Sequence, residues 1–480
     1  GAPPDSVPPP PPPRVGECSL GEATGAGLRP LGLDMHALGV GLHMPGKARV
    51  VDKVKEMVET AKHDVLDSIF SDPQATPKAS SPVSAGAGVV KRGDVLQDGR
   101  YTVVRKLGSG TFGCVYCAHD RVSDSFVAIK MQKPGRKYSQ VALDEVGLLR
   151  TCQAERDRLH AERAHAESEF CAGDYIVELS GHFEHKGPKG SQVCMHLEML
   201  GPSLLDLVKD FSYKGVPITV VKTIARNVLT GLDFLHRTCG IIHTDVKPEN
   251  ILLSIPRDES MPQADLWGTR KGRRGDADSP AWWREHAIKT HNGWELVNGW
   301  SRELYAGGSG FEPRAKLVDL GNACRIDKPF TPDIQTIEYR CPEVILGSGY
   351  STPADMWSVA CTVFELLTGE YLFDPKKGQG RVVYDREEDL LALQQELLGA
   401  MPIPLACGGK VSHKYFNPDG KMKHIYFLSF WALTDVLVQK YGFDQRVADE
   451  CADFLLPMLE FDPAKRATAA EMLQHPWLQS

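Results

Sequence analysis

The sequence predicts an α+β fold with two lobes, a small lobe rich in β-strands and a larger helical lobe. Apolar runs of strand-like composition occupy residues 101–104 and 126–130, with a glycine-rich stretch between them. A helical segment follows, because Leu148 and Leu149 come three and four residues after Glu145 and share its face of a helix. Of the 480 residues 42% are hydrophobic, which is ample for a buried core.

The first 94 residues form an N-terminal extension in this prediction. Residues 1–45 are rich in proline and glycine, a composition typical of extended or unstructured chain. Apolar residues recur with helical spacing at about residues 48–70, which predicts one amphipathic helix. A lone helix of this length is marginal in water, so we expect it to dock on the rest of the chain or on a partner.

Residues 108–115, Gly-Ser-Gly-Thr-Phe-Gly-Cys-Val, predict a loop that binds phosphate groups. Glycine has no side chain and lets the backbone approach phosphate oxygens. The strand-like run that follows distinguishes the stretch from a dinucleotide-binding motif, in which a helix follows the glycines. The residues of this region that we expect to contact a nucleotide are Leu107, Gly108, Ser109, Gly110, Thr111, Phe112, Gly113, Cys114, Val115, Ala128 and Lys130.

Lys130 ends an apolar run in which an unpaired charge would be costly to bury. One interpretation is a surface lysine that extends its stem along the strand. The functional interpretation pairs Lys130 with a carboxylate, either Glu145 or its neighbour Asp144, and with the phosphates of a nucleotide.

Residues 243–250, His-Thr-Asp-Val-Lys-Pro-Glu-Asn, have the composition of a phosphoryl-transfer loop. Such a loop needs a carboxylate to accept a hydroxyl proton and, a few residues later, an amide oxygen to hold a metal ion. Asp245 and Asn250 have this spacing, and Lys247 between them can reach the transferred phosphate. A second metal ligand is expected at Asp319, in Asp-Leu-Gly after a strand-like run.

Residues 251–318, 68 in all, separate these two motifs. Direct connections longer than about 15 residues are uncommon unless they contain structure of their own. We therefore expect a spacer insertion at about residues 254–313. The spacer contains five of the eight tryptophans, which favours partial folding. It also contains a basic cluster at residues 270–274, which is either a solvated loop or a nuclear localisation signal.

The order and the residues of these motifs resemble those of the SR-protein kinases, which phosphorylate serines in Arg-Ser repeats of splicing factors. The resemblance covers about residues 95–480, apart from the spacer. LAMMER-type kinases also act on Arg-Ser substrates, but their signature helix is absent from residues 387–394. The stretches that carry the resemblance are residues 243–253, 316–324, 350–357, 368–375 and 454–477.

The resemblance implies the bilobal protein-kinase fold, with the N-lobe and hinge at residues 95–201 and the C-lobe at residues 202–480. It implies ATP as the phosphate donor and Mg²⁺ as the metal, held by Asn250 and Asp319. The catalytic residues it implies are Asp245, Lys247, Lys130, Glu145 and Thr336. Adenine is expected to contact Leu197 and the hinge residues Glu198 and Leu200.

Three positions depart from common kinase patterns. Thr244 replaces the arginine that often binds a phosphorylated activation loop, so we expect activity without such a phosphate. Ile337 stands where SR-protein kinases usually have arginine, and Glu338 follows it. These two residues lie where the substrate residue after the acceptor serine binds, which favours a basic residue there.

The expected partners are Arg-Ser-rich proteins, because carboxylates pair well with guanidinium groups. Glu370 and Asp374 are the docking candidates, although a solvated acidic face is the alternative. A net charge of −7 gives no support for direct nucleic-acid binding, and no run of 18 apolar residues predicts a membrane span. Twelve cysteines without paired spacing indicate a reducing compartment, and we expect a monomer in the cytoplasm and nucleus.

Two other functions remain open at this point. One is a kinase of the same wider group whose substrate is not Arg-Ser, as Ile337 and Glu338 suggest. The other is a pseudokinase, a binding scaffold with a kinase fold. A pseudokinase would normally lack one of the residues Lys130, Asp245, Asn250 and Asp319, all of which are present.

Overall fold

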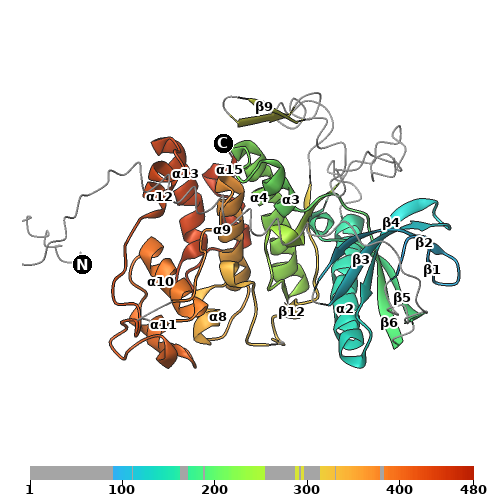
Figure 1. Ribbon diagram of the computed structural model, residues 1–480, viewed down its shortest axis with the longest axis horizontal. Coiled ribbons are helices and arrows are strands. Elements are labelled where there is room, and N and C mark those ends of the chain that lie inside the picture. The colour runs from blue at the N-terminus through green and yellow to red at the C-terminus, as the bar shows by residue number, and fades with distance from the viewer. Residues whose placement is uncertain are drawn as a thin grey trace, which may run out of the picture. The chain divides into compact units, whose positions relative to one another are not determined.

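The computed structural model describes residues 90–110, 112–162, 171–187, 190–254, 287–290, 293–296, 314–329, 331–378 and 383–479. The helix expected at about residues 48–70, the nucleotide-contacting candidate Thr111 and most of the spacer lie outside these ranges. Figure 1 shows one lobe built around a β-sheet and another built of helices. The predicted bilobal α+β fold is confirmed.

The small lobe is built on a six-stranded sheet with the order β1-β2-β3-β4-β6-β5. All neighbouring strands in it are antiparallel. The glycine-rich loop joins β2 to β3, and the strand that carries Lys130 comes only after β3, one strand later than the apolar runs alone indicated. The strands are β1 (Val95–Leu96), β2 (Tyr101–Ser109), β3 (Gly113–Asp120), β4 (Ser125–Gln132), β5 (Leu179–Gly187) and β6 (Gly190–Leu197).

Helix α2 (Arg136–Glu162) packs against this sheet and carries Glu145. Its buried face contains Ala142, Val146 and Leu149, which recur at helical spacing, and the last two join the core of the large lobe. A second, smaller core fills the other side of the sheet and includes Tyr101. Because α2 is packed against both lobes, its position fixes Glu145 relative to the large lobe.

The large lobe is mostly helical, and α9 lies at its centre. Every residue of α9 from Ala354 to Thr368 is buried, as expected for a helix that is apolar on all sides. Gly369 ends α9 with φ +81°, and a Cβ there would lie 2.3 Å from the carbonyl oxygen of Tyr213. No other residue fits that position without moving the neighbouring backbone.

The remaining helices connect or surround α9. The α-helices are α3 (Leu204–Asp210), α4 (Ile218–Asp233), α8 (Pro342–Leu346), α9 (Pro353–Thr368), α10 (Arg386–Leu398), α11 (Ile403–Gly408), α12 (Leu433–Gln439), α13 (Gln445–Leu455), α14 (Ala469–Met472) and α15 (Pro476–Gln479). A π-helical turn, η2 (Phe234–Cys239), extends α4, and the 3₁₀ turns are η1 (Ala172–Tyr175), η3 (Pro248–Asn250), η4 (Ile337–Tyr339), η5 (Ser412–Lys414) and η6 (Leu456–Leu459). None of the helices in the described ranges combines the length and apolarity that a membrane span requires.

Two short antiparallel strand pairs place the predicted catalytic loop. Strand β7 (Ile241–Ile242) pairs with β12 (Cys324–Arg325), and β8 (Ile251–Leu253) pairs with β11 (Ala315–Leu317). Residues 243–250 therefore run between β7 and β8, alongside residues 318–323 between β11 and β12. The pairing brings together two motifs that lie far apart in the sequence.

The spacer contributes one described element, a hairpin of β9 (Ala287–Thr290) and β10 (Gly293–Leu296). The basic cluster at residues 270–274 lies outside the described part of the chain.

Candidate active site

Lys130 contacts both carboxylates that could orient it. Its Nζ atom donates hydrogen bonds to Glu145 Oε1 at 2.6 Å, Glu145 Oε2 at 2.8 Å and Asp319 Oδ1 at 2.7 Å. The alternative partner, Asp144, instead accepts a hydrogen bond from Gln140. The contact of Lys130 with Glu145 joins β4 to α2, and that with Asp319 joins β4 to the segment after β11.

Burial and ion pairing act in opposite directions on the pKa values of Lys130 and Asp319. Burial alone would lower the pKa of Lys130, but attraction to Glu145 and Asp319 outweighs it and raises that pKa. Burial would likewise raise the pKa of Asp319, but Lys130 and its hydrogen bond lower that pKa below its usual value. A Cβ on Gly321 would lie 3.1 Å from Asp319 Oδ1 and 3.4 Å from Glu145 Oε2, so this glycine leaves room for the ion pairs.

The predicted catalytic loop forms a closed set of hydrogen bonds. Lys247 Nζ donates to Asp245 Oδ2 and to Thr336 Oγ1, both at 2.8 Å. Thr336 Oγ1 donates to Asp245 Oδ1 at 2.8 Å, and Asn250 Nδ2 donates to the carbonyl oxygen and Oδ2 of Asp245 at 2.9 and 3.0 Å. Three residues expected at the site, Lys247, Thr336 and Asn250, thus hold the Asp245 carboxylate in one orientation.

Asp355 on α9 anchors the start of this loop. It is fully buried, and its two carboxylate oxygens accept the backbone N–H groups of His243 and Thr244, each at 2.8 Å. Burial would raise the pKa of Asp355, but a hydrogen bond with His236 and the charges of nearby histidines lower it. The carboxylate therefore stays ionised and holds the loop on the central helix.

Thr244 has an unusual backbone conformation for a β-branched residue, with φ +69°. Besides its amide bond to Asp355, its Oγ1 donates to the carbonyl oxygen of Asn322 at 2.9 Å. This bond joins the catalytic loop to the segment just after Asp319. The neutral contact occupies the place where many kinases use an arginine that binds a phosphate.

The glycine-rich loop is a tight turn between β2 and β3. Gly110 N–H donates to the Gly113 carbonyl at 2.9 Å, and Gly108 pairs with Val115 across the two strands. A Cβ on Gly108 or Gly110 would meet no atom within 4 Å, whereas one on Gly113 would lie 2.1 Å from the Met131 carbonyl oxygen. Gly108 and Gly110 therefore face open space, whereas position 113 needs a glycine because its backbone lies very close to β4.

The expected adenine-contacting residues lie at the edge of the same sheet. Ala128 in β4 is the pairing partner of Leu197, the last residue of β6, so the two are neighbours. The carboxylate of Glu198 is bound by Lys316 at 2.7 Å and accepts the Glu178 amide at 2.8 Å. That side chain is therefore occupied. Because the Glu198 backbone N–H donates to the Glu178 carbonyl at 3.0 Å, the group that Glu198 can offer a ligand is its carbonyl oxygen.

Oxygen atoms suited to a metal ion lie on Asn250 and Asp319. Their hydrogen bonds use Asn250 Nδ2 and Asp319 Oδ1. Within the described residues, no hydrogen bond involves Asn250 Oδ1 or Asp319 Oδ2. One carboxylate and one amide oxygen fit a hard divalent cation that completes its shell with phosphate and water.

The substrate floor predicted at Ile337 and Glu338 is held by charged partners. Glu338 Oε1 accepts a hydrogen bond from Arg386 Nη2 at 2.5 Å. Gln335 has φ +68°, and its carbonyl oxygen accepts a bond from Arg340 at 2.9 Å. Because Arg386 neutralises Glu338, this carboxylate is less available to a basic substrate residue than the sequence indicated.

The docking candidates Glu370 and Asp374 also have partners within the chain. Glu370 binds Lys440 at 2.8 Å and the Tyr441 hydroxyl at 3.0 Å, and Asp374 binds Lys376 at 2.6 Å. The pairs of Glu370 and Asp374 lie on the surface, where ion pairs are weak and exchangeable, whereas the pair of Glu338 with Arg386 is partly buried.

The sequence reasoning missed two carboxylates, Glu249 and Glu365. Glu249 is exposed on the catalytic loop, and within the described residues no lysine or arginine forms an ion pair with it. Glu365 on α9 is 3% exposed and accepts a hydrogen bond from the Tyr339 hydroxyl at 2.5 Å. Burial and the nearby charges of Glu249 and Glu338 raise the pKa of Glu365 to about 7, despite the lowering effect of Tyr339.

These carboxylates form one acidic cluster around Tyr371, whose ring lies edge-on to that of Tyr339. Burial raises the pKa of Tyr371, and four of the carboxylates raise it further. The pKa of the fifth carboxylate, Glu370, is lowered chiefly by its hydrogen bond with Lys440, whereas burial and the charge of Asp374 act in the opposite direction. The acidic cluster consists of Glu249, Glu338, Glu365, Glu370 and Asp374.

Comparison with known proteins agrees with this geometry. The sequence matches the protein kinase domain over residues 101–266 and 308–478. The serine/threonine-protein kinase SRPK of Physarum polycephalum is 42% identical over 396 residues, covering 81% of this chain and 88% of that protein. Protein kinase dsk1 of Schizosaccharomyces pombe is 34% identical over 531 residues, covering 94% of this chain and 95% of the relative.

A human relative, SRSF protein kinase 3, is 34% identical over 512 residues, which cover 81% of this chain and 88% of the human protein. These matches extend over both lobes and include the residues of the site described above. The chain belongs to the SR-protein kinase family and is an ATP-dependent serine/threonine protein kinase.

Proposed function

We propose that this kinase transfers the γ-phosphate of ATP to serines in Arg-Ser-rich proteins. The observation that carries the proposal is the acidic cluster beside the catalytic loop. It contains five carboxylates, and three of them are paired with the described cations Arg386, Lys440 and Lys376. Glu249 and Glu365 remain without a cation. Glu365 is buried and bonded by the Tyr339 hydroxyl, so Glu249 is the exposed carboxylate that is left for a substrate arginine.

The residues of the catalytic loop act on the substrate hydroxyl in this proposal. Asp245 accepts or steers the serine proton, and its orientation is fixed by Thr336 and Asn250. Lys247 neutralises charge on the transferred phosphoryl group, and Lys130, held by Glu145, binds the α- and β-phosphates. The backbone groups of Glu198 and Leu200, with Leu197 and Ala128, bind adenine, and residues 107–115 cover the phosphates.

Asn250 and Asp319 would hold Mg²⁺. The available oxygen atoms of both side chains fit this ion, which is usually bound through one or two carboxylates together with substrate phosphates. When bound, the ion neutralises charge on the phosphates. The protein prepares for this by directing Lys130 to Oδ1 of Asp319, which leaves Oδ2 for the ion.

An arginine side chain is the group that matches the acidic cluster best. Guanidinium groups bind carboxylates through two parallel hydrogen bonds, and they remain charged at any pH a cell reaches. Glu249 lies four residues after Asp245, so an arginine bound to it would lie close to the reacting serine. The exposed ion pairs at Glu370 and Asp374 can exchange their lysines for substrate arginines at little cost.

A second surface feature fits an arginine-rich ligand less well. A hollow of about 400 Å³ is lined by Lys377, Tyr384, Asp385, Glu388, Lys414 and Tyr415, among others. Glu388 there is already bound by His424 at 2.7 Å, and two lysines oppose the acids. The charges of this hollow nearly cancel, so we assign substrate docking to the acidic cluster.

We further propose that the kinase needs no activating phosphate. The Thr244–Asn322 hydrogen bond and the anchoring of Thr244 by Asp355 hold the catalytic loop in place without a charged link. Substrates that are splicing factors imply work in the cytoplasm and nucleus, and we propose both locations for the chain. A kinase with a non-Arg-Ser substrate is less favoured, because Arg386 neutralises Glu338.

The test is phosphate transfer from ATP-Mg²⁺ to two matched peptides, one of Arg-Ser repeats and one of Lys-Ser repeats, with Asp245→Asn as the inactive control. Transfer to the Arg-Ser peptide alone, lost in the control, is the expected result. Equal transfer to both peptides would retain the kinase and overturn the arginine preference. Transfer to neither, by protein that still binds ATP, would overturn the assigned substrate class.

A further inference from the structure

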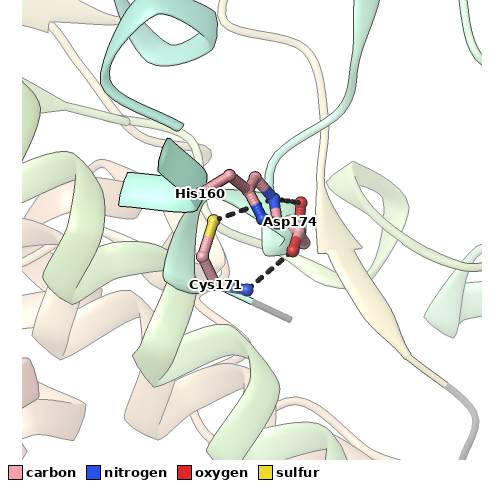
Figure 2. A group of neighbouring side chains, drawn as sticks. All are labelled: His160, Cys171 and Asp174. Atoms are coloured by element: carbon pink, nitrogen blue, oxygen red, sulfur yellow. Dashed lines mark hydrogen bonds and ion pairs between the residues drawn. The ribbon is translucent and has the colours of Figure 1, made fainter. Parts of the chain in front are cut away.

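His160, Cys171 and Asp174 converge on one point away from the active site. Figure 2 shows their side chains pointing toward one another. His160 Nε2 lies 3.4 Å from Cys171 Sγ and 3.1 Å from Asp174 Oδ1. One potential ligand atom from each residue lies within 4.8 Å of the other two, and within the described residues these three form the sole such group.

Two elements bring the three residues together. His160 lies in the last turn of α2, and Cys171 and Asp174 belong to the turn η1 and its N-terminal cap. Gly173 lets η1 approach α2, because a Cβ there would lie 2.7 Å from Cβ of Arg156. Arg156 is one turn before His160 on the same helix, so this close packing also sets the distance from η1 to the imidazole.

The shorter hydrogen bonds of η1 leave His160 Nε2 and Asp174 Oδ1 facing each other, and the Cys171 thiol has in addition a long contact of 4.0 Å with the carbonyl oxygen of Arg156. The Cys171 backbone N–H donates to Asp174 Oδ2 at 2.8 Å, which caps the turn and directs Oδ1 toward His160. One ring nitrogen, Nε2, then faces both a thiol and a carboxylate. A single hydrogen on Nε2 can point fully at one of them, and without it Nε2 and Oδ1 face each other with lone pairs. A cation would satisfy all three atoms together.

Two of the three separations between these atoms fit tetrahedral coordination, and the third, from Cys171 Sγ to Asp174 Oδ1, lies within 4.8 Å. Zinc bond lengths of about 2.3 Å to sulfur and about 2.0 Å to nitrogen and oxygen give S–N and N–O separations of roughly 3.5 and 3.3 Å. The observed separations of 3.4 and 3.1 Å differ from these by small shifts. A thiolate, an imidazole and a carboxylate are ligand types that zinc accepts together.

We propose that His160 Nε2, Cys171 Sγ and Asp174 Oδ1 bind one Zn²⁺ ion, with water as the fourth ligand. The ion enters from the solvent side, where the His160 side chain is 42% exposed. On binding, Cys171 forms the Zn–S bond and its thiol proton passes to solvent. The site is separate from the phosphoryl-transfer centre, so this proposal does not depend on the substrate proposed above.

A nucleophilic or redox role for Cys171 fits the structure less well. The residue is 1% exposed, and burial, with the charge of Asp174, raises the pKa of its thiol. Reactive cysteines are instead accessible and have a lowered pKa. His160 also faces both partners through the same nitrogen, whereas a catalytic triad needs a different ring nitrogen for each.

The proposed ion would fasten α2 to the segment that leads into the active site. Glu145, the partner of Lys130, lies on α2 15 residues before His160. On the other side, η1 leads directly to Ile176 and Val177, which bond to Leu317 in β11, two residues before Asp319. Bound zinc would therefore stabilise the arrangement of α2 and β11 that brings Glu145 and Asp319 to Lys130.

The test is a titration of the full chain with Co²⁺, without ATP or Mg²⁺, followed by the thiolate-to-cobalt charge-transfer absorption in the near ultraviolet. We expect a band that saturates at one equivalent and is displaced by Zn²⁺. Cys171→Ser should abolish the band, and His160→Ala should weaken Co²⁺ binding about tenfold or more. Cys407→Ser, which removes an exposed thiol elsewhere, should behave like the wild type.

The carboxylates of the active site cannot produce this band, because it requires a thiolate. Absence of the band in the wild type, its persistence in Cys171→Ser, or equal affinity in His160→Ala and the wild type would each overturn the proposal. Thermal unfolding without metal identifies variants that fail to fold. If Cys171→Ser is one of these, the affinity of His160→Ala, altered at a partly exposed position, decides the question.

Discussion

Two groups of charged side chains lie next to each other in this kinase, and they are balanced differently. In the catalytic group, Lys130 contacts two carboxylates and Lys247 contacts Asp245. In the acidic cluster around Tyr371, five carboxylates share three described cations. The chain therefore uses its own lysines to fix the geometry of the catalytic group, and it leaves the exposed carboxylate Glu249 without a described cation where we propose that the substrate binds.

Removing the cation of the catalytic group should have the largest effect. Lys130→Met leaves Glu145 and Asp319 without their shared partner and removes a phosphate-binding group. We expect kcat/KM to fall about 10²- to 10³-fold, as for loss of one preorganised donor. Steady-state kinetics measures this, with thermal unfolding to show that the variant is folded. Lys133→Met, which changes an exposed lysine directly after β4, should retain full activity.

The buried carboxylate of the acidic cluster should make stability depend on pH. The pKa of Glu365 is raised to about 7 in the folded protein, so the folded state binds this proton more tightly than the unfolded state. Its stabilising contribution is complete below the unfolded pKa of 4.5 and is lost as the pH rises through about 7. The loss amounts to about 3 kcal/mol of unfolding free energy.

Glu365→Gln, which is neutral at all pH values, should remove this dependence. Denaturant unfolding at several pH values measures it, and the variant should exceed the wild type in stability above pH 7 by the largest margin. Tyr339→Phe should move the dependence to higher pH, because the Tyr339 hydrogen bond lowers the pKa of Glu365. Parallel pH curves for the wild type and Glu365→Gln would contradict the assignment.

Removing the hydrogen bond between Thr244 and Asn322, which links the two motifs of the catalytic group, should have a moderate effect. Thr244→Ala removes the hydrogen bond to Asn322, and we expect kcat to fall about fivefold, the equivalent of one neutral bond. Thr244→Ser retains the hydroxyl and is the matched control. Phosphatase treatment of the wild type should leave kcat unchanged, and loss of activity on treatment would show that a phosphate is needed after all.

The smallest effect is expected where the acidic cluster is already neutralised. Arg386→Gln frees Glu338 to bind a basic residue after the acceptor serine. We expect KM for peptides with arginine there to fall about threefold, because a partly exposed ion pair is weak. Arg446→Gln breaks an exposed pair with Glu450 and should change nothing. An unchanged KM in Arg386→Gln would place Glu338 outside the substrate floor.

The sequence was a good guide to the catalytic group because its members lie in short motifs. Three of them, Asp245, Lys247 and Asn250, lie within the six residues 245–250, so their hydrogen bonds follow from local backbone geometry. The choice of Glu145 over Asp144 rested on the family resemblance, and the structure agrees with it because Glu145 is buried and Asp144 is exposed. The extra strand β3 was missed, since it begins inside the glycine-rich stretch and ends in His119 and Asp120, which hides its short apolar part.

The acidic cluster was beyond this reasoning. A sequence shows that Glu370 is acidic, but its partner Lys440 lies 70 residues away and is placed by the fold. Glu365 is part of an otherwise apolar helix, where a carboxylate is readily taken for a solvent-facing residue until its burial is known. The convergence of His160 with Cys171 depends on the close approach that Gly173 allows, for which the chain carries no motif.

The difference between the two groups is tested most directly by a double-mutant cycle. Wild type and Glu249→Gln are each assayed on an Arg-Ser peptide and on the same peptide with citrulline, a neutral isostere, in place of arginine. Asp419→Asn, an exposed carboxylate far along the chain, is the control. If the acidic cluster binds arginine, Glu249→Gln raises KM about tenfold for the arginine peptide and leaves the citrulline peptide unaffected. Equal effects on both peptides, or a fall in kcat alone, would contradict the account and place Glu249 with the catalytic group.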